Sequence, residues 1–225
     1  MKFNETRIGL KLIIAVGIIT IVIIGVFSYF SISAQSDALS SQAEIHANKL
    51  SEAIKNSTLT SMLENKKEEV HAIINTVSNE PSILEIRILN KEGAVTFSSR
   101  KDSIGKMVDK RAESCYACHT ENQPLEKLSM NERMRIYRIS PDSPRILGVI
   151  NPIYNEPSCY QAACHAHTRD QTVLGVLDIK MDLKDVDQQI EGSKFRLIIF
   201  AVIAILALSF FIAYFVRRWI GKPVG

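Results

Sequence analysis

The sequence predicts an α+β domain placed between two membrane-spanning helices. Two long apolar runs without charge lie near the two ends of the 225-residue chain. A stretch with helical periodicity follows the first run, and five short segments with strand patterns occupy most of the remaining chain. A long leading helix followed by antiparallel strands is typical of a sheet with helices on one face.

The first element is an apolar run at 12–34, and a second such run lies at 195–216. A helix needs about 20 apolar residues to cross a bilayer, so each run is long enough to span it. A cleaved signal peptide is the alternative for the first run. Its apolar part is longer than usual, and Ser31 to Gln35 make a poor cleavage site, which favours an uncleaved anchor.

Basic residues flank both predicted spans on their outer sides. They are Lys2, Arg7 and Lys11 before the first span, and Arg217, Arg218 and Lys222 after the second. This asymmetry predicts that residues 1–11 and 217–225 are cytoplasmic, in a bacterial inner membrane. The central domain, residues 35–194, is then periplasmic, where thiols are not kept reduced. No basic stripe indicates nucleic-acid binding.

A helix is expected directly after the first span. Its apolar positions share one seam: Leu39, Ala43, Ala47, Leu50 and Ile54. Such a seam predicts either a dimer contact or packing on the chain's own domain. Further apolar positions continue the helix to Val77, with a break expected within 56–61. Pro81 prevents its continuation beyond Asn79.

Five strands are expected, joined by turns and by two irregular insertions. The strands are predicted at 83–89, 94–98, 134–139, 145–153 and 172–181. The insertions, 101–132 and 155–171, contain all four cysteines. Loops on a rigid scaffold are where binding residues usually collect, so the site is expected there. A short polar helix at 184–193 then leads into the second span.

The first insertion contains the motif Cys115-Tyr116-Ala117-Cys118-His119. Cys-x-x-Cys-His is the attachment pattern of c-type haem. Two thiols at this spacing add to the two vinyl groups of the macrocycle, and His119 then lies under the iron as an axial ligand. A disulfide or redox pair, and half of a zinc site, are the alternatives.

The second insertion contains a related pattern in which the two cysteines are further apart. It runs from Cys159 to Cys164, His165 and His167. A four-residue spacer occurs in haem attachment sites of some multihaem cytochromes, and His165 is then the axial ligand. A Cys159–Cys164 disulfide and metal binding are the alternatives. One haem c is therefore expected at the first motif, and a second haem at this one competes with a disulfide.

The sixth ligand of each iron has several candidates. His167 is only two residues from His165, so it would ligate the other iron or a haem of a partner chain. His71 lies in a charged stretch of the leading helix, where solvent exposure is its ordinary role. Methionine is a common haem ligand, and four are available: Met62, Met107, Met130 and Met134. An open site that binds a gas also fits the sequence.

These patterns together resemble the periplasmic sensor regions of bacterial transmembrane receptors with a Cache or PAS-like fold. The segments that carry the resemblance are 86–93, Ser98-Ser99, Ile104-Gly105 and 174–178. Cys115 to His119, 151–159 and 163–165 resemble more specifically the haem-bearing sensors of histidine kinases. Ile220-Gly221-Lys222-Pro223-Val224 resembles the start of a HAMP relay. The resemblance implies a homodimer and a longer kinase or methyl-accepting parent.

Three functions follow as hypotheses. The first is a sensory input region whose haem responds to redox state or a small gas. The second is a membrane-anchored periplasmic cytochrome for electron transfer, which gives no reason for a second span. The third is a Cache sensor for a small organic ligand, stapled by disulfides and without haem. No nucleotide-binding loop or nucleophile with an adjacent base appears in the sequence, so this segment is expected to be non-enzymatic.

Overall fold

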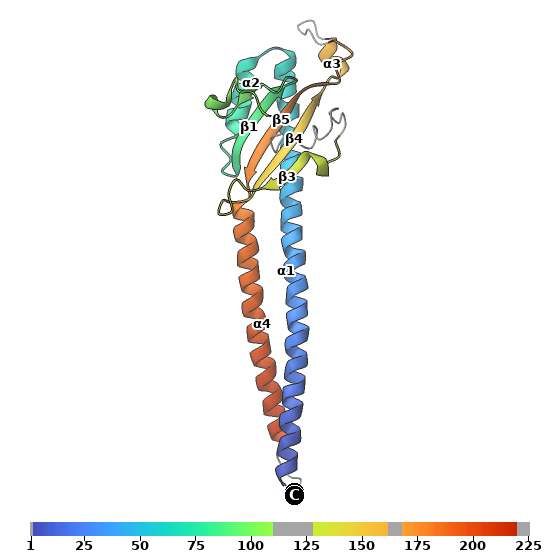
Figure 1. Cartoon of the computed structure of the whole chain (residues 1–225), viewed down its shortest axis with the longest axis vertical. Helices are drawn as coiled ribbons and strands as arrows, with labels where there is room; N and C mark the ends of the chain where they lie inside the picture. Colours follow the sequence, from blue (N-terminus) through green and yellow to red (C-terminus); the bar gives the residue numbers. More distant parts are fainter. Residues whose placement is uncertain (1, 110–127, 162–167, 220–225) are drawn as a thin grey trace. The chain divides into compact units, whose positions relative to one another are not determined.

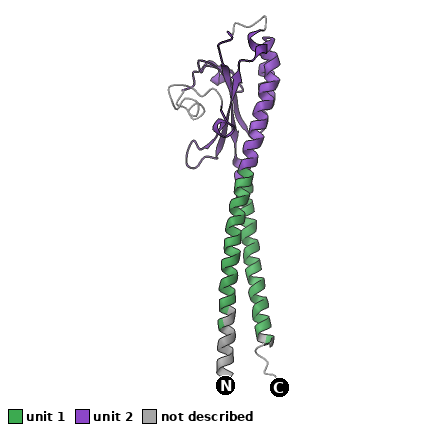
Figure 2. Ribbon diagram, turned by 90° about the vertical axis from the view of Figure 1, so that its right-hand side faces the viewer, with its two compact units in different colours: residues 1–40, 188–225 green, residues 41–187 purple. Residues whose placement is uncertain are grey.

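The computed structural model describes residues 2–109, 128–161 and 168–219. The chain forms two compact units, which Figure 2 distinguishes by colour. One unit comprises residues 1–40 and 188–225, and the other comprises residues 41–187. The second unit contains the sheet and the described residues of the predicted sites.

Two long helices, α1 (Lys2–Leu63) and α4 (Lys184–Trp219), contain the apolar runs. Both are long and apolar enough to cross a membrane, with windows of mean hydropathy 2.4 and 2.9. Neither window is buried inside the structure, and large side chains such as Phe27 and Phe210 are exposed. A core helix of a soluble domain would bury such side chains, so lipid is the environment that suits them.

Five strands form one antiparallel sheet with the order β2-β1-β5-β4-β3 (Figure 1). Their bounds are β1 Ile83–Asn90, β2 Val95–Ser98, β3 Met134–Tyr137, β4 Ile146–Tyr154 and β5 Val173–Asp182. The predicted α+β class, with a long leading helix and an antiparallel sheet, is confirmed. Strand β5, the last in the chain, lies in the centre between β1 and β4.

Helices cover one face of this sheet. The seam residues Ala47 and Ile54 of α1 are buried in one cluster with Ile74 of α2 (Lys67–Val77). The same cluster contains Ile86 of β1 and Leu177 of β5. Most of the seam therefore packs on its own domain, which is one of the two roles that its periodicity allowed.

The leading helix departs from the prediction at its break. No break occurs within 56–61, because the polar side chains there are accommodated inside the helix. The buried Thr58 hydroxyl donates to the carbonyl of Ile54 at 2.9 Å, one turn earlier. The chain turns later, at Asn65, whose φ of 54° is left-handed and is tolerated by asparagine.

Ends of β1, β2, β4 and β5 differ from the prediction by one residue, and two larger differences remain. Strand β3 ends at Tyr137 rather than 139, because its partner β4 begins at Ile146, directly opposite Tyr137. The predicted short helix at 184–193 is no separate element, since α4 runs continuously from Lys184. The backbone N–H of Lys184 donates to the carboxylate of Asp182 at 2.7 Å, which starts α4 immediately after β5.

Candidate functional site

Most residues of the two cysteine motifs lie outside the described residues. These are Cys115, Cys118, His119, Cys164, His165 and His167. Of the predicted site residues, the structure describes Cys159 and His71. In the described part of the chain, no three His, Cys, Asp or Glu side chains are grouped to hold a metal ion.

Cys159 lies on the short helix α3 (Pro157–Tyr160), directly after β4. Pro157 presets the helical backbone at the first turn, and the Cys159 N–H donates to the Glu156 carbonyl at 2.8 Å. The thiol-bearing residue is only 3% exposed. The start of the second insertion therefore turns its first cysteine into the protein rather than toward solvent.

Hydrogen bonds join the two described ends of the second insertion. The Asn155 N–H donates to the Thr172 carbonyl at 2.9 Å. The Asn155 side-chain amide donates to the carbonyls of Thr168 and Gln171 at 2.9 and 2.8 Å. These hydrogen bonds continue the β4–β5 pairing, so the sheet holds the segment from which α3 and Cys159 follow.

An apolar cavity of about 230 Å³ adjoins Cys159. Its walls come from the end of α1, the start of α2, and the strands β1, β2, β4 and β5, together with α3. Its apolar lining residues are Leu59, Met62, Leu63, Val70, Ile88, Leu89, Phe97, Ile153, Cys159 and Leu174. Lys66 and Lys67 also line it and are exposed.

The other ligand candidates lie in different surroundings. His71 on α2 is half-buried, and its ring centroid is 4.9 Å from that of Phe97. Met107 is 64% exposed, and Met130 is also exposed. Met134 is buried in the core on β3. Of the four methionines, Met62 alone lines the cavity.

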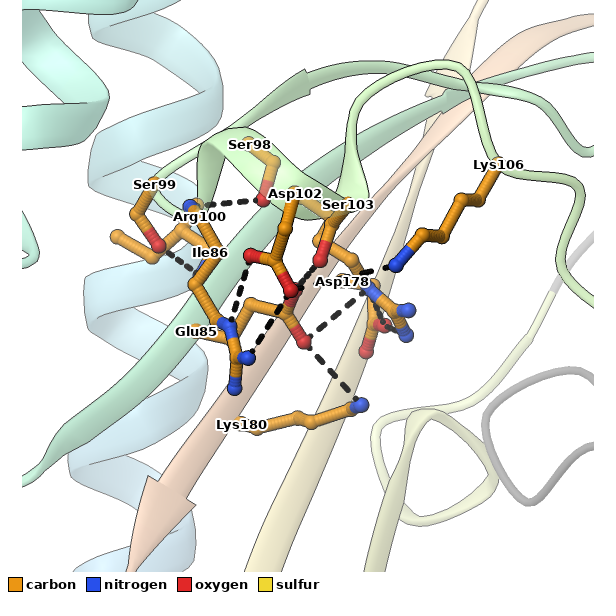
Figure 3. A network of polar contacts seen from close by, with 11 residues as sticks. Glu85, Ile86, Ser98, Ser99, Arg100, Asp102, Ser103, Lys106, Asp178 and Lys180 are labelled. Atoms are coloured by element: carbon orange, nitrogen blue, oxygen red, sulfur yellow. Dashed lines mark hydrogen bonds and ion pairs between the residues drawn. The ribbon is translucent and has the colours of Figure 1, made fainter.

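The opposite face of the sheet carries a cluster of charged residues, shown in Figure 3. Ile86 and Ile88 point into the helix-covered core, so the alternating residues Glu85 and Arg87 lie on the other face. Arg87 pairs with Asp178 through two hydrogen bonds, one of which measures 3.0 Å from Nε to Oδ2. Lys180 lies 3.3 Å from Glu85.

Glu85 is at the centre of this cluster and is ionised. Burial alone would raise the pKa of its carboxyl group. The Ser103 hydroxyl, which donates to Glu85 at 2.6 Å, and the charges of Arg87 and Lys180 outweigh burial and hold its pKa below the usual range. Ser103 belongs to the helix η1 (Lys101–Ser103), so the cluster joins the sheet to the start of the first insertion.

Sequence reasoning did not single out this cluster. A signal was present, because Glu85 and Arg87 on one strand and Asp178 and Lys180 on another are each two residues apart. Charged residues at that spacing share a face of their strand. Which charge lies beside which depends on the register of the two strands, which places Arg87 opposite Asp178 and Glu85 opposite Lys180. Asp178 is 1% exposed, and its Oδ1 atom accepts no hydrogen bond from the described residues.

A second series of polar contacts joins the segments beside both insertions to one turn of α1. Arg133 of the helix η2 (Asn131–Arg133), near the end of the first insertion, lies 3.1 Å from Glu52. Glu52 lies 2.7 Å from Lys55, whose ammonium donates to the amide oxygen of Asn151 at 3.1 Å. Asn151 is on β4, the strand that leads into the second insertion.

The charge state of Glu52 supports this series of contacts. Partial burial raises the pKa of its carboxyl group, but hydrogen bonding with Lys55 and Asn151 and the charges of Lys55 and Arg133 lower it further. The net pKa is below the ordinary value, so Glu52 is ionised at neutral pH.

No protein-family model matches the sequence, and no curated protein matches it. Solved structures with some similarity exist. The Escherichia coli DcuS sensor domain is 16% identical at a TM-score of 0.40, covering 70% of this chain and 98% of that one. The sensor domain of the Vibrio cholerae histidine kinase DctB is 17% identical at a TM-score of 0.43. This comparison covers 69% of our chain and 56% of the DctB chain.

A third similar structure is the periplasmic domain of RsbU from Chlamydia trachomatis, with 16% identity and a TM-score of 0.35. That comparison covers 74% of this chain and 59% of the RsbU chain. All three similarities are weak in identity and in superposition. They do not assign a ligand.

Proposed function

We propose that this chain is the sensory input region of a transmembrane signalling receptor and that it binds covalent c-type haem. The observation that carries the proposal is the Cys-x-x-Cys-His motif at 115–119, located between two helices that are long enough to span a membrane. Haem c is attached on the exporting side of the membrane. The basic flanks of both spans favour that side for the central domain, with both termini in the cytoplasm.

The described part of the second motif fits a haem as well. A c-type thioether forms when a thiol adds across a vinyl group, with the sulfur bonding to one carbon and the thiol hydrogen passing to the other. Cys159 faces an apolar cavity in which a vinyl-bearing edge of a macrocycle would be desolvated favourably. A haem bound there supplies an iron whose oxidation and ligation states respond to redox poise or to a small gas.

The series of polar contacts at Glu52 and Lys55 could transmit such a response to α1. Arg133 and Asn151 belong to the two segments that border the insertions, and both connect to Glu52 and Lys55 on α1. Helix α1 is continuous from this turn to its apolar run. A change at either insertion would therefore bias the position or rotation of one helix that leads to the membrane.

The resemblance to receptor input regions further implies a symmetric homodimer and a longer parent protein with a cytoplasmic output. The seam on α1 is occupied by packing within its own domain. A dimer contact would therefore use residues other than Ala47 and Ile54. The output activity, whether a histidine kinase or a methyl-accepting relay, belongs to the parent and is proposed only for it.

The decisive experiment is an intact mass and a haem-stained denaturing gel of the full chain, expressed with c-type maturation factors. The matched variants are Cys118→Ala and Cys164→Ala. Two haems that are lost separately with the two substitutions would support both sites. One haem lost only with Cys118→Ala would make the second motif structural.

Two other results favour other functions. A colourless, fully folded chain would reject haem binding and favour a disulfide-stapled sensor of a small organic ligand. A haem protein that exchanges electrons rapidly with a soluble cytochrome, with no conformational response to reduction, would favour a membrane-anchored electron carrier.

A further inference from the structure

We propose that the apolar cavity beside the turn between α1 and α2 binds a small neutral apolar molecule, about the size of a substituted benzene ring. All residues that line this cavity belong to the unit 41–187, which contains the sheet. The inference goes beyond the proposed function, because it needs no iron. The size, the polarity and the position of the cavity support it.

The volume of the cavity sets the size of its occupant. It measures about 230 Å³. An engineered apolar cavity of about 150 Å³ binds benzene or xenon, whereas pockets for drug-sized ligands measure about 300–1,000 Å³. The cavity therefore has room for a benzene ring with a short substituent and is too small for a whole drug-sized molecule.

Apolar side chains around the cavity retain surface that an occupant would cover. Leu59, Met62 and Leu63 at the end of α1 are only half-buried, as are Phe97 of β2 and Leu174 of β5. Removing apolar surface from water is favourable in proportion to its area. An apolar occupant would therefore be bound by the hydrophobic effect.

Polar side chains in the wall already have partners within the chain. The Ser61 hydroxyl donates to the Glu69 carboxylate at 3.1 Å. The Thr96 hydroxyl donates to the carbonyl of Ile88 at 2.9 Å. The described part of the chain contains buried side-chain polar atoms without a hydrogen bond, but none of them belongs to a residue that lines the cavity. The wall therefore leaves no buried polar group for a ligand to satisfy.

The two lysines of the wall lie at its exposed edge. Lys66 is 2.6 Å from Glu64 and 3.3 Å from Glu69, so its charge is already paired. Lys67 is exposed and keeps its hydration. A charged ligand would lose its own water on entering the apolar wall, where it gains no buried partner. The cavity therefore favours a neutral molecule over an anion of the same shape.

The position of the cavity gives binding an effect on the helix that leads to the membrane. Its wall joins the last turns of α1 to Val70 of α2 and to the sheet. An occupant in contact with all three would favour the arrangement in which the end of α1 is held against the sheet. Since a haem attached to Cys159 would fill part of the same space, the two occupants would compete.

The test is a titration of the full chain in lipid nanodiscs with toluene, followed through the methyl resonances of isotope-labelled methionine. Met62 lines the cavity, whereas Met134 is buried elsewhere in the core and Met107 is exposed. We expect a saturable shift of the Met62 resonance and none of the other two. Benzoate, which has a similar shape and a negative charge, should bind at least about tenfold more weakly.

A variant that fills the cavity distinguishes this site from toluene dissolved in the lipid. Leu174→Phe adds a ring at the wall and should weaken toluene binding by about tenfold or more. The matched control is Leu84→Phe, at a residue of β1 that is 44% exposed and does not line the cavity. It should leave toluene binding unchanged. If Leu174→Phe does not fold, the contrast between Met62 and Met134 in the unmodified chain decides.

Several results would overturn the inference. They are equal shifts of Met62 and Met134, an unchanged affinity in folded Leu174→Phe, and tighter binding of benzoate than of toluene, which would assign the cavity to an acid held by Lys67. A haem on Cys159 that abolishes the response to toluene would overturn it as well.

The haem content of the same samples, measured by intact mass, tests the proposed function separately. A chain without haem whose Met62 resonance responds to toluene would support this inference and reject haem binding. A chain with haem on the first motif and no response at Met62 would do the reverse.

Discussion

At the residue scale, the most informative position is Asp178, whose carboxylate is buried beneath the charged face of the sheet. Its partner Arg87 is also largely buried, so neither charge is well solvated by water. Such a pair contributes little net stability compared with apolar side chains, but losing one member leaves the other buried without compensation. We therefore expect the cluster to favour one pairing and register of the strands more than it adds free energy.

This argument predicts that Asp178→Asn lowers the free energy of unfolding by roughly 2 kcal/mol, because Arg87 loses its charge-assisted hydrogen bonds and keeps only Glu85, 3.7 Å from its Nε atom, as an opposite charge. Urea denaturation of the full chain in detergent, followed by near-ultraviolet circular dichroism, measures the change. Asp102→Asn is the matched control, since Asp102 pairs with Arg100 at the surface, where both side chains are about 60% exposed. It should cost far less than Asp178→Asn, because a solvated ion pair contributes little to stability. Equal effects of the two substitutions would contradict the burial argument.

Glu85 predicts a dependence of stability on acid. Its pKa in the folded state is below the ordinary value of 4.5, so the unfolded state binds a proton more readily. The stabilisation is therefore complete above the unfolded pKa and is lost as the pH falls through the folded pKa. Urea midpoints measured from about pH 6 to about pH 3 should fall less steeply for Glu85→Gln than for the wild type.

The exposed Glu92 provides the control for that titration. Glu92→Gln should leave the acid dependence of the urea midpoint as it is in the wild type, because its side chain is solvated. An unchanged slope in Glu85→Gln would mean that the cluster does not hold Glu85 ionised in the folded protein.

At the element scale, the sheet positions the cavity through the close approach of β1 and β5. A Cβ atom at Gly175 would lie 2.3 Å from the carbonyl oxygen of Leu89, a distance that backbone atoms do not tolerate. Both residues line the cavity. The packing of these two strands therefore requires glycine at this position and sets the width of the cavity at that end.

We expect Gly175→Ala to destabilise the domain by about 2 kcal/mol, because β5 must move away from β1 to make room for the methyl group. Thermal unfolding measured by circular dichroism provides the comparison with Gly192→Ala. Gly192 is in α4, and a methyl group added there would meet no atom within 4 Å beyond its own stretch of helix. Alanine there should stabilise the helix by up to about 1 kcal/mol. If Gly175→Ala leaves the thermal unfolding unchanged, the two strands separate without loss of stability.

The elements could be predicted from the sequence because each has a local periodicity. The strand bounds follow the alternation of apolar and polar residues, as in Ile86, Arg87 and Ile88. The end of α1 was mispredicted because the Thr58 hydroxyl bonds within the helix instead of ending it. The cavity could not be predicted, since its lining comes from segments as distant as Met62, Phe97 and Cys159. Local patterns do not encode which distant side chains meet.

At the scale of the whole molecule, continuous chain joins the domain to both candidate membrane helices. Helix α1 runs without interruption from its apolar run to Met62 at the cavity, and α4 begins immediately after the central strand β5. The central strand and the helix at the cavity are thus each connected directly to one candidate span. If the chain binds haem as proposed, a signal at its iron would need no further domain to reach the membrane.

With haem bound as proposed, this continuity predicts that reduction of the haem changes the distance between the two helices near the membrane surface. Spin labels at Gln35 and Ser193 lie on α1 and α4, respectively. Helix shifts in signalling transitions are about 1–2 Å, and a change of that size in the label distance is expected between the oxidised and reduced states. Glu52→Gln should diminish the change, because it removes the ion pairs that Glu52 of α1 makes with Arg133 and with Lys55. A label distance that is identical in both oxidation states would reject the sensory mechanism and leave electron transfer as the role of the haem.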